Sequence, residues 1–216
     1  MRVFQLTAQA SVANHFLAEM RHQKIQQDSL RFRRNLERLG EVLAYELSKT
    51  LPYKNATVST PLGLAHTQLL TEQPVLAAIL RAGLPFYQGF LNFFDQAESA
   101  FIGAYRGEAS SDHSFDIEVH YATTPRLDDK VLILIDPMLA TGKSLYLVYK
   151  RLLHFGQPRE LHIISAIASR AGIQYLEEQL PEASLWVGDI DEELNAKSYI
   201  IPGLGDAGDL AFGVKE

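Results

Sequence analysis

Two uninterrupted apolar segments constrain the fold of this chain most: Val75–Leu80 (VLAAIL) and Val131–Ile135 (VLILI). A strand with one face in water alternates apolar and polar residues, whereas a strand buried on both faces has no reason to alternate. Strands of the second kind are typical of parallel sheets that are covered by helices. The two segments therefore predict central strands of an α/β fold.

The surrounding sequence continues this pattern of strands and helices. Further strands are expected at residues 100–105, 161–168 and 185–190. One helix is expected from Pro85 toward Phe94, and another over residues 144–155, where Gly156 ends it. The alternation predicts a parallel sheet with right-handed crossovers and flanking helices.

The remaining segments add helices and antiparallel strands. Residues 12–49 read as two helices; Asp28 or Ser29 is a candidate N-cap of the second, which carries an apolar stripe of Phe32, Leu36, Leu39, Leu43 and Leu47. Residues 56–70 predict a β-hairpin that turns at 60–63. Residues 107–114 are small and polar and predict a mobile loop, and residues 115–121 alternate like a half-exposed strand.

Charge and composition exclude several classes of protein. The chain has 20 basic and 26 acidic residues, a net charge of −6, which argues against a general nucleic-acid coat or an anionic membrane surface. It has no cysteine, so disulfides, thiolate nucleophiles and cysteine-based zinc sites are excluded, and its seven histidines form no metal-binding pattern. We find neither a membrane-length apolar run nor a signal peptide and expect a cytoplasmic location.

Three charged residues follow predicted strands and are the first candidates for a site. Arg81, Arg106 and Asp136 stand at the carboxyl ends of their strands. Because parallel strands share a direction, these ends meet at one edge of the sheet, where ligands bind in such folds. A lone arginine at a strand end is usually a surface ion-pair residue, but the expected convergence favours a site.

The segment after residue 135 carries the most chemistry: Asp136, Pro137, Met138, Leu139, Ala140, Thr141, Gly142, Lys143 and Ser144. Its small, hydroxylated end leads into a helix and would direct N–H groups at an anion such as a phosphate. A carboxylate beside a phosphate is favourable only if it binds neutral donors, and ribose hydroxyls fit. One alternative is that Asp136 only caps the helix. Another is a nucleotide-kinase phosphate loop, but Pro137 occupies its first glycine position.

A second glycine-rich segment lies near the end of the sequence. Residues 203–208 match Gly-x-Gly-x-x-Gly, but only eight residues follow, too few for the helix and strand of a dinucleotide fold. The segment is better interpreted as a loop whose bare backbone approaches a flat ligand. Asp206 and Asp209 are alternatively simple turn formers. The acidic stretch 189–193 is expected to be a solvated loop.

These motifs together resemble the uracil phosphoribosyltransferase family. The resemblance rests on residues 79–84 (ILRAGL), on Tyr105-Arg106, on residues 136–142 (DPMLATG) and on residues 199–209 (YIIPGLGDAGD). Arg31-Phe32-Arg33 in the first long helix is also similar. The resemblance implies a type I phosphoribosyltransferase fold, with a parallel sheet flanked by helices and a small hood that contains a β-hairpin. It also implies transfer of the phosphoribosyl group of phosphoribosyl pyrophosphate to uracil, which gives UMP and pyrophosphate.

The resemblance assigns a role to each motif. Residues 136–144 would bind phosphoribosyl pyrophosphate with Mg²⁺ held through that substrate, Arg81 and Arg106 would bind its diphosphate, and Asp206 would lie near it. Ile200, Gly205, Asp206 and Ala207 would form the uracil pocket. The implied catalytic set is Arg81, Arg106, Asp136 and Asp206, with no metal ligated by the protein alone. We expect one domain over residues 1–216: N-terminal helices and hairpin (12–70), core sheet (74–190), and base-binding loop with hood (191–216). Relatives associate, which implies a homodimer or homotetramer.

Several positions depart from the family pattern. Lys143 stands where a second glycine is usual, Ser169-Arg170 replaces Ala-Pro, Leu210 replaces a common arginine, and residues 121–125 lack a lysine. Fewer basic groups near a polyanionic substrate suggest an alternative function: a regulatory relative that binds UMP or phosphoribosyl pyrophosphate but turns over slowly. A kinase, the third hypothesis, would consume ATP.

Overall fold

The computed structural model describes residues 1–109 and 115–214, and for residues 104–120 it describes no side chains. Within these residues the main sheet has eight strands. In spatial order they are β1 (Arg2–Gln5), β10 (Ser184–Asp191), β9 (Glu160–Ser169), β7 (Val131–Ile135), β4 (Val75–Leu80), β5 (Glu98–Ala109) and β6 (Phe115–Thr123), with β8 (Met138–Leu139) beside β9. All neighbours are parallel except β5 and β6.

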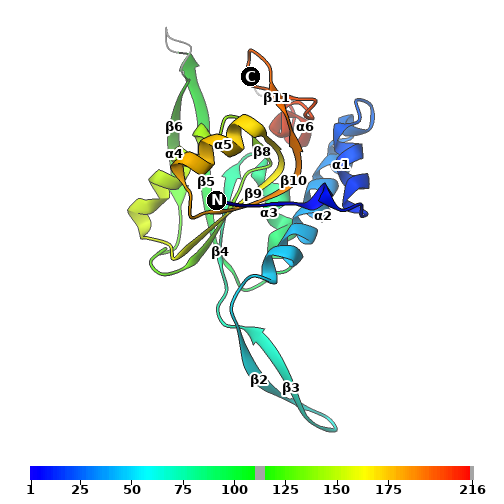
Figure 1. Ribbon diagram of the computed structural model, residues 1–216, viewed down its shortest axis with the longest axis vertical. Coiled ribbons are helices and arrows are strands. Elements are labelled where there is room, and N and C mark those ends of the chain that lie inside the picture. The colour runs from blue at the N-terminus through cyan, green and yellow to red at the C-terminus, as the bar shows by residue number, and fades with distance from the viewer. Residues whose placement is uncertain (110–114, 215–216) are drawn as a thin grey trace.

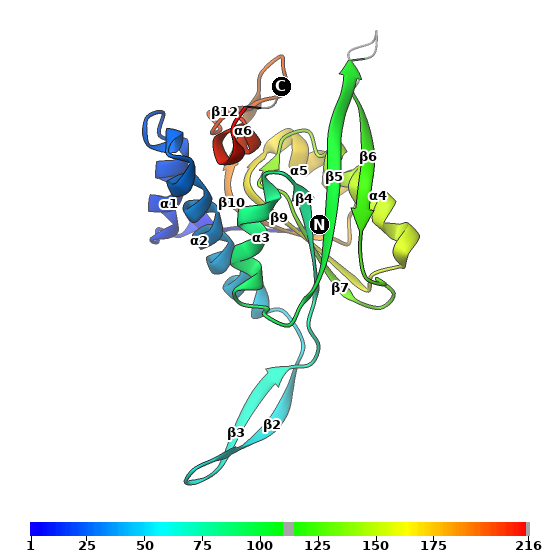
Figure 2. The ribbon, with the colours of Figure 1, turned by 180° about the vertical axis from the view of Figure 1, so that it is seen from behind.

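Helices cover both faces of this sheet (Figures 1 and 2). On one side lie α1 (Ala13–Arg21), α2 (Ser29–Ser48) and α3 (Gly83–Leu91), and on the other α4 (Lys143–Leu152) and α5 (Arg170–Gln179). Three short 3₁₀ helices connect elements: η1 (Leu6–Ala8), η2 (Ile25–Gln27) and η3 (Leu153–Phe155). The described part of the chain is thus the predicted α/β sandwich.

The two apolar segments behave as their sequence predicts. Along β4, Leu76 and Ala78 face the α1–α3 core, whereas Ala77 and Ile79 face the α4–α5 core. Strand β7 divides its side chains between the same two cores. Each residue of these strands except the half-buried Leu80 is buried on one face or the other, because a helical layer lies on each side.

Helix α2 shows the predicted local signals. The apolar stripe of four leucines and one phenylalanine is fully buried: Phe32, Leu36, Leu39, Leu43 and Leu47. The N-cap is Asp28, whose side chain accepts a hydrogen bond from the Arg31 backbone N–H (3.1 Å). The stripe is therefore part of the core and leaves no apolar face of α2 uncovered for another protein.

The predicted β-hairpin is present, and it lies outside the main sheet. Strands β2 (Tyr53–Thr60) and β3 (Gly63–Leu70) form a separate antiparallel pair joined at Pro61 and Leu62. The pair projects from one end of the molecule, whereas β5, β6 and the C-terminal segment lie at the other (Figure 1). That segment contains the short pair β11 (Glu193–Leu194) and β12 (Ile200–Ile201) and helix α6 (Ala207–Phe212).

Some boundaries differ from the sequence-based expectation. Strand β5 runs to Ala109, so Arg106 lies within a strand, opposite Ile117 of β6, and not at a strand end. Residues 107–109 of the predicted mobile loop therefore belong to β5, and residues 110–114 lie outside the described residues. Antiparallel pairing with β6 is what prolongs β5, and the alternating pattern of residues 115–121 gave no indication of its partner.

Strand β1 and helices α5 and α6 were not expected from the sequence. Strand β1 has four residues and gains its hydrogen bonds from the neighbouring β10, so its local pattern is too short to predict.

None of the helices in the described part of the chain has the length and apolarity to cross a bilayer.

Candidate active site

The carboxyl ends of β7 and β4 bring two of the predicted residues to one edge of the sheet. Ala78 of β4 lies in register with Ile135 of β7. Asp136 follows β7 directly and Arg81 follows β4 directly, so both lie beyond the same edge. The adjacent strand β5 carries Arg106 further in the same direction. The backbone topology thus brings the three segments together, while the Arg106 side chain lies outside the described residues.

The segment that follows β7 is fastened to β9 by its backbone. Asp136 donates its N–H to Ile164 O (3.1 Å), and the carbonyl of Pro137 accepts from the N–H groups of Ala166 and Ile167 (3.0 and 3.1 Å). Met138 and Leu139 then form β8 along the same strand. Residues 136–144, hereafter the phosphate loop, therefore begin as an extension of the sheet.

The Asp136 carboxylate remains at the start of this loop. One of its oxygens accepts a hydrogen bond from the Met138 N–H (3.3 Å), and the residue has further interactions. The N-cap of α4 is Gly142, in a left-handed conformation (φ 76°). The alternative that Asp136 caps the following helix is therefore wrong, because six residues separate it from the helix start.

The end of the phosphate loop meets the start of α4. Lys143 and Ser144 form the first turn of α4, and the N-cap supplies no side-chain hydrogen bond to it. Thr141 and Ser144 are half-buried, whereas Lys143 is exposed. The first-turn N–H groups carry the positive end of the helix dipole, so this turn favours an anion.

Two serines, neither of them a predicted site residue, hold the loop from behind. Ser165 donates its hydroxyl to the Asp136 carbonyl (2.6 Å). Ser169, the N-cap of α5, donates to the Ala140 carbonyl (2.5 Å) and accepts from the Gly172 N–H (2.9 Å). A Cβ on Gly172 would overlap the Ala140 carbonyl oxygen, so only glycine permits this approach. The serine at an N-cap position was the available sequence signal for Ser169.

The C-terminal segment contains the predicted uracil-pocket residues. Ile200 and Ala207 are buried, with 5% and 2% exposed. Gly205 is exposed (φ 95°), and no atom lies within 4 Å of the position a Cβ would take. Asp206 caps α6 by accepting from the N–H groups of Gly208 and Asp209 (2.8 and 3.0 Å), and it has further interactions.

Arg81 joins the sheet edge to this segment. Its guanidinium donates to the Asp209 carboxylate and to the Gly213 carbonyl (both 3.2 Å). Asp209 is therefore the ion-pair partner of a predicted diphosphate-binding residue, and not only a turn former. Leu210, where the resemblance leads us to expect an arginine, packs against the core and supplies no charge.

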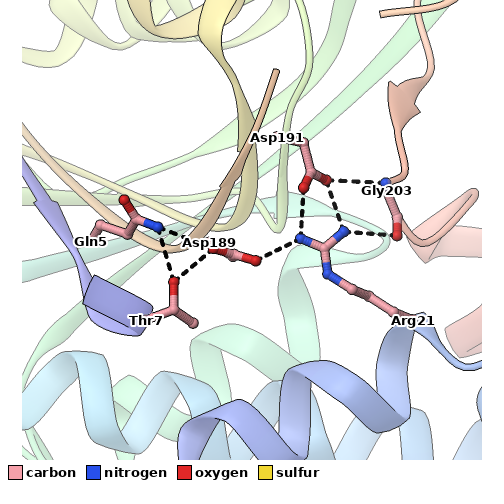
Figure 3. Close-up of polar contacts among 6 residues, drawn as sticks. All are labelled: Gln5, Thr7, Arg21, Asp189, Asp191 and Gly203. Atoms are coloured by element: carbon pink, nitrogen blue, oxygen red, sulfur yellow. Dashed lines mark hydrogen bonds and ion pairs between the residues drawn. The ribbon is translucent and has the colours of Figure 1, made fainter. Parts of the chain in front are cut away.

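The acidic stretch 189–193 is only in part the solvated segment that was expected: Glu192 and Glu193 are exposed, whereas Asp189 and Asp191 belong to β10. Asp189 and Asp191 are among the last three residues of β10, and the Asp191 side chain is only 6% exposed. Both bind the Arg21 guanidinium at the end of α1 (Figure 3). A sequence pattern shows that aspartates are charged but not that an arginine 168 or 170 residues away neutralises them.

Electrostatics within this ion-pair cluster favour its charged form. Burial opposes the charge on Arg21, but the hydrogen bonds that it donates to Asp191 and Asp189, together with their negative charges, outweigh burial and raise the Arg21 pKa. Burial likewise opposes the charge on Asp189, but hydrogen bonds from Thr7 and Arg21 lower its pKa. Both shifts favour the charged forms of Arg21 and Asp189.

A mainly parallel sheet with this loop at its carboxyl edge is the fold of the type I phosphoribosyltransferases. A hypoxanthine-guanine phosphoribosyltransferase from Bacillus anthracis has the same fold: 13% identity, TM-score 0.50, covering 74% of this chain and 78% of its own. The AQ2163 protein from Aquifex aeolicus is far more similar, with 33% identity and TM-score 0.87 over 98% of both chains.

The sequence comparisons narrow the class. A family model described as uracil phosphoribosyltransferase matches residues 7–214. The uracil phosphoribosyltransferase of Porphyromonas gingivalis is 51% identical over 216 residues, 100% of both chains. That of Thermococcus gammatolerans is 40% identical over 86% of this chain and 83% of its own. The chain belongs to the uracil phosphoribosyltransferase family and is an enzyme of the glycosyltransferase type, which leaves the kinase interpretation without support.

Proposed function

We propose that this protein transfers the phosphoribosyl group of phosphoribosyl pyrophosphate to uracil. The anomeric C1–O bond to the diphosphate breaks, a bond forms from C1 to uracil N1, and N1 loses its proton. The products are UMP and pyrophosphate. The carrying observation is the meeting of the two family motifs in space: Arg81, beside the phosphate loop, contacts α6 of the C-terminal segment.

The phosphate loop is proposed to bind the sugar phosphate. Backbone N–H groups of residues 138–144 and the hydroxyls of Thr141 and Ser144 would hold the 5-phosphate at the start of α4. Asp136 would accept hydrogen bonds from the ribose hydroxyls. Its negative charge would also favour the positive charge that develops on the sugar in an oxocarbenium-like transition state.

Charge on the departing diphosphate has to be stabilised as well. Arg81 and Arg106 are the proposed groups for this role, because Arg81 follows β4 directly and the adjacent strand β5 carries the Arg106 backbone past the end of β4. The described residues hold no group of three or more histidine, aspartate or glutamate side chains that fits a metal. The oxygens of the substrate's diphosphate are ligands that suit Mg²⁺, and an ion bound through them would neutralise charge on the leaving group.

Uracil is proposed to bind against the backbone of Ile200, Gly205, Asp206 and Ala207. Uracil presents two carbonyls and an N–H, which peptide groups can match directly. Cytosine presents an amine in place of one carbonyl and would set a donor against a donor. A buried unpaired group is costly, so we expect the site to discriminate against cytosine.

Turnover of purified protein tests the proposal. Uracil, phosphoribosyl pyrophosphate and Mg²⁺ are expected to yield UMP and pyrophosphate in equal amounts, with cytosine as the control base. Calorimetric binding of UMP or phosphoribosyl pyrophosphate without turnover would favour the regulatory alternative instead. The exposed Lys143 and the partly buried Leu210 are the departures that such a result would implicate.

We also propose a cytoplasmic homo-oligomer, a dimer or a tetramer. Because the α2 stripe is buried, the apolar surface has to come from elsewhere. The hairpin exposes Val58, Leu62, Leu64 and Leu69, and a projecting apolar arm is a natural element of an interface. Light scattering of the purified protein tests the association, and a monomer at every concentration would reject it.

A further inference from the structure

We propose that Arg21 is a positioning residue for uracil recognition. Through the buried carboxylate of Asp191 it fixes the peptide groups of Gly203, which lies between Ile200 and residues 205–207, the residues that are proposed to contact the base. The inference rests on the proposed function, since it concerns the affinity of that same pocket. Arg21 lies in α1, outside the family motifs and outside the residues that are proposed to form the uracil pocket.

The Arg21 guanidinium is shared among three acceptors (Figure 3). Its two terminal nitrogens each donate to Asp191 (2.8 and 2.9 Å), one also donates to Asp189 (2.9 Å), and the other to the Gly203 carbonyl (3.0 Å). Such a planar fork fixes position and direction together. The Arg21 side chain is 19% exposed and that of Asp191 is 6% exposed, so water competes little for these bonds.

Gly203 is held at both of its polar groups. Its N–H donates to Asp191 (3.0 Å), and its carbonyl accepts from Arg21. The residue is left-handed (φ 58°), and a Cβ there would overlap the Ile200 carbonyl oxygen. The turn from Ile200 to Gly203 is therefore tight, and Arg21 and Asp191 connect it to α1 and to β10.

A second contact extends the same support along the chain. In the amide orientation that satisfies its polar atoms, Gln26 of η2 donates to the Leu204 carbonyl (3.0 Å). Leu204 itself is buried. By contrast, the next residue, Gly205, is exposed and has open space around it. The held residues Gly203 and Leu204 thus lie between Ile200 and the other residues that are proposed to contact the base.

The cluster is itself held from behind. Asp189 also accepts from the hydroxyl of Thr7 (2.6 Å) and the amide of Gln5 (3.1 Å). A peptide-lined pocket gains affinity only if its backbone is already in place before the base arrives. Loosening Arg21 is therefore expected to weaken uracil binding more than binding of the sugar diphosphate.

A matched control lies on the same pair of helices. Arg31 of α2 binds Glu19 of α1 through two nitrogens (2.8 and 2.5 Å). No contact of this pair reaches the described C-terminal segment. Arg31→Lys therefore breaks a comparable fork without touching Gly203, and it separates loop positioning from general loss of stability.

The test compares Arg21→Lys with Arg31→Lys, because both keep the positive charge and lose the fork. Arg21→Lys is expected to raise the KM for uracil about tenfold and to change the KM for phosphoribosyl pyrophosphate by less than about twofold, as a misplaced pocket would. Arg31→Lys is expected to change neither. Asp191→Asn, which keeps the shape but removes the charge, serves if Arg21→Lys fails to fold.

Hydrogen exchange gives a readout that is independent of activity. Amides of residues 200–206 are expected to exchange faster in Arg21→Lys than in the wild type or Arg31→Lys. Equal uracil KM values for the two variants would overturn the proposal, even if exchange accelerates. If the wild type does not turn over uracil, the proposed function fails, and unchanged exchange would still separately reject Arg21 as the group that holds the loop.

Discussion

Ser169 and Gly172 fix the phosphate loop at the scale of single residues. The serine hydroxyl connects the first turn of α5 to the Ala140 carbonyl. The glycine allows α5 to approach that carbonyl closely. The resemblance to the family leads us to expect Ala-Pro at positions 169 and 170. Ser169 therefore supplies a hydrogen bond that an alanine would lack.

Gly172→Ala is expected to displace the phosphate loop. The added methyl group overlaps the Ala140 carbonyl oxygen, and overpacking of this kind costs about 1–3 kcal/mol of stability. The KM for phosphoribosyl pyrophosphate should rise while that for uracil changes little, as steady-state kinetics would measure. The neighbouring exposed Ala171, changed to Ser, is the control, and a Gly172→Ala enzyme with unchanged kinetics would contradict the expectation.

Residue-level prediction from the sequence succeeded where the interaction is local. Asp28 was predicted as an N-cap because it acts on an N–H three residues away. The roles of Asp189 and Asp191 were predicted wrongly, since their partner Arg21 is distant in sequence. A charged residue carries a local pattern of polarity, but nothing in that pattern names the opposite charge.

At the scale of elements, helices α1 and α2 together support the C-terminal segment. Arg21 of α1 holds Gly203, and Arg33 of α2 donates to the Ala211 carbonyl (2.6 Å) in α6. The two helices are connected to each other by Glu19, which accepts from Arg31 and Asn35. The resemblance at Arg31-Phe32-Arg33 thus marks an ion pair, a core residue and a contact with α6.

The stabilisation that Glu19 gives to the pairing of α1 with α2 is expected to weaken at acidic pH. Hydrogen bonds from Arg31 and Asn35 lower the pKa of Glu19 from 4.5 to about 2. The folded state therefore favours the ionised carboxylate, and its stabilisation is present above pH 4.5 and lost as pH falls toward 2. The pair is partly exposed, so the effect should be modest.

Glu19→Gln tests this dependence. The melting temperature of the wild type should exceed that of the variant near neutral pH, and the difference should shrink progressively below the ordinary carboxyl pKa. Circular dichroism melts over a pH series measure it. Glu46→Gln, which breaks an exposed pair with Lys49 at the end of α2, is the control; a difference independent of pH would show that Glu19 does not act through its charge.

At the scale of the whole molecule, the N-terminus completes the sheet. Strand β1 pairs in parallel with β10, and Phe4 packs on Trp186 (ring centroids 4.9 Å apart). Without β1, the backbone of β10 would form an open edge. Gln5, at the end of β1, also contacts Asp189, so the edge of the sheet and the support of the C-terminal segment are joined.

Deletion of residues 2–5 is accordingly expected to lower the melting temperature and to promote aggregation through the uncovered edge of β10. Arg2→Ala keeps every backbone hydrogen bond of the strand and should behave like the wild type. Calorimetry and light scattering measure the two effects. A deletion variant as stable and as soluble as the wild type would show that β1 is dispensable to the sheet.

The sequence by itself determined which strands are central, where the phosphate loop starts and that a glycine loop follows the sheet. These properties are local, because burial on two faces, helix capping and chain reversal are each encoded within a few neighbouring residues. Only the tertiary structure decided that β5 carries Arg106 past the sheet, that Arg81 meets Asp209, and that Arg21 holds Gly203 through Asp191. The physical reason is that a charge or a hydroxyl takes whichever partner the fold brings near, and that proximity is set by packing across the whole chain.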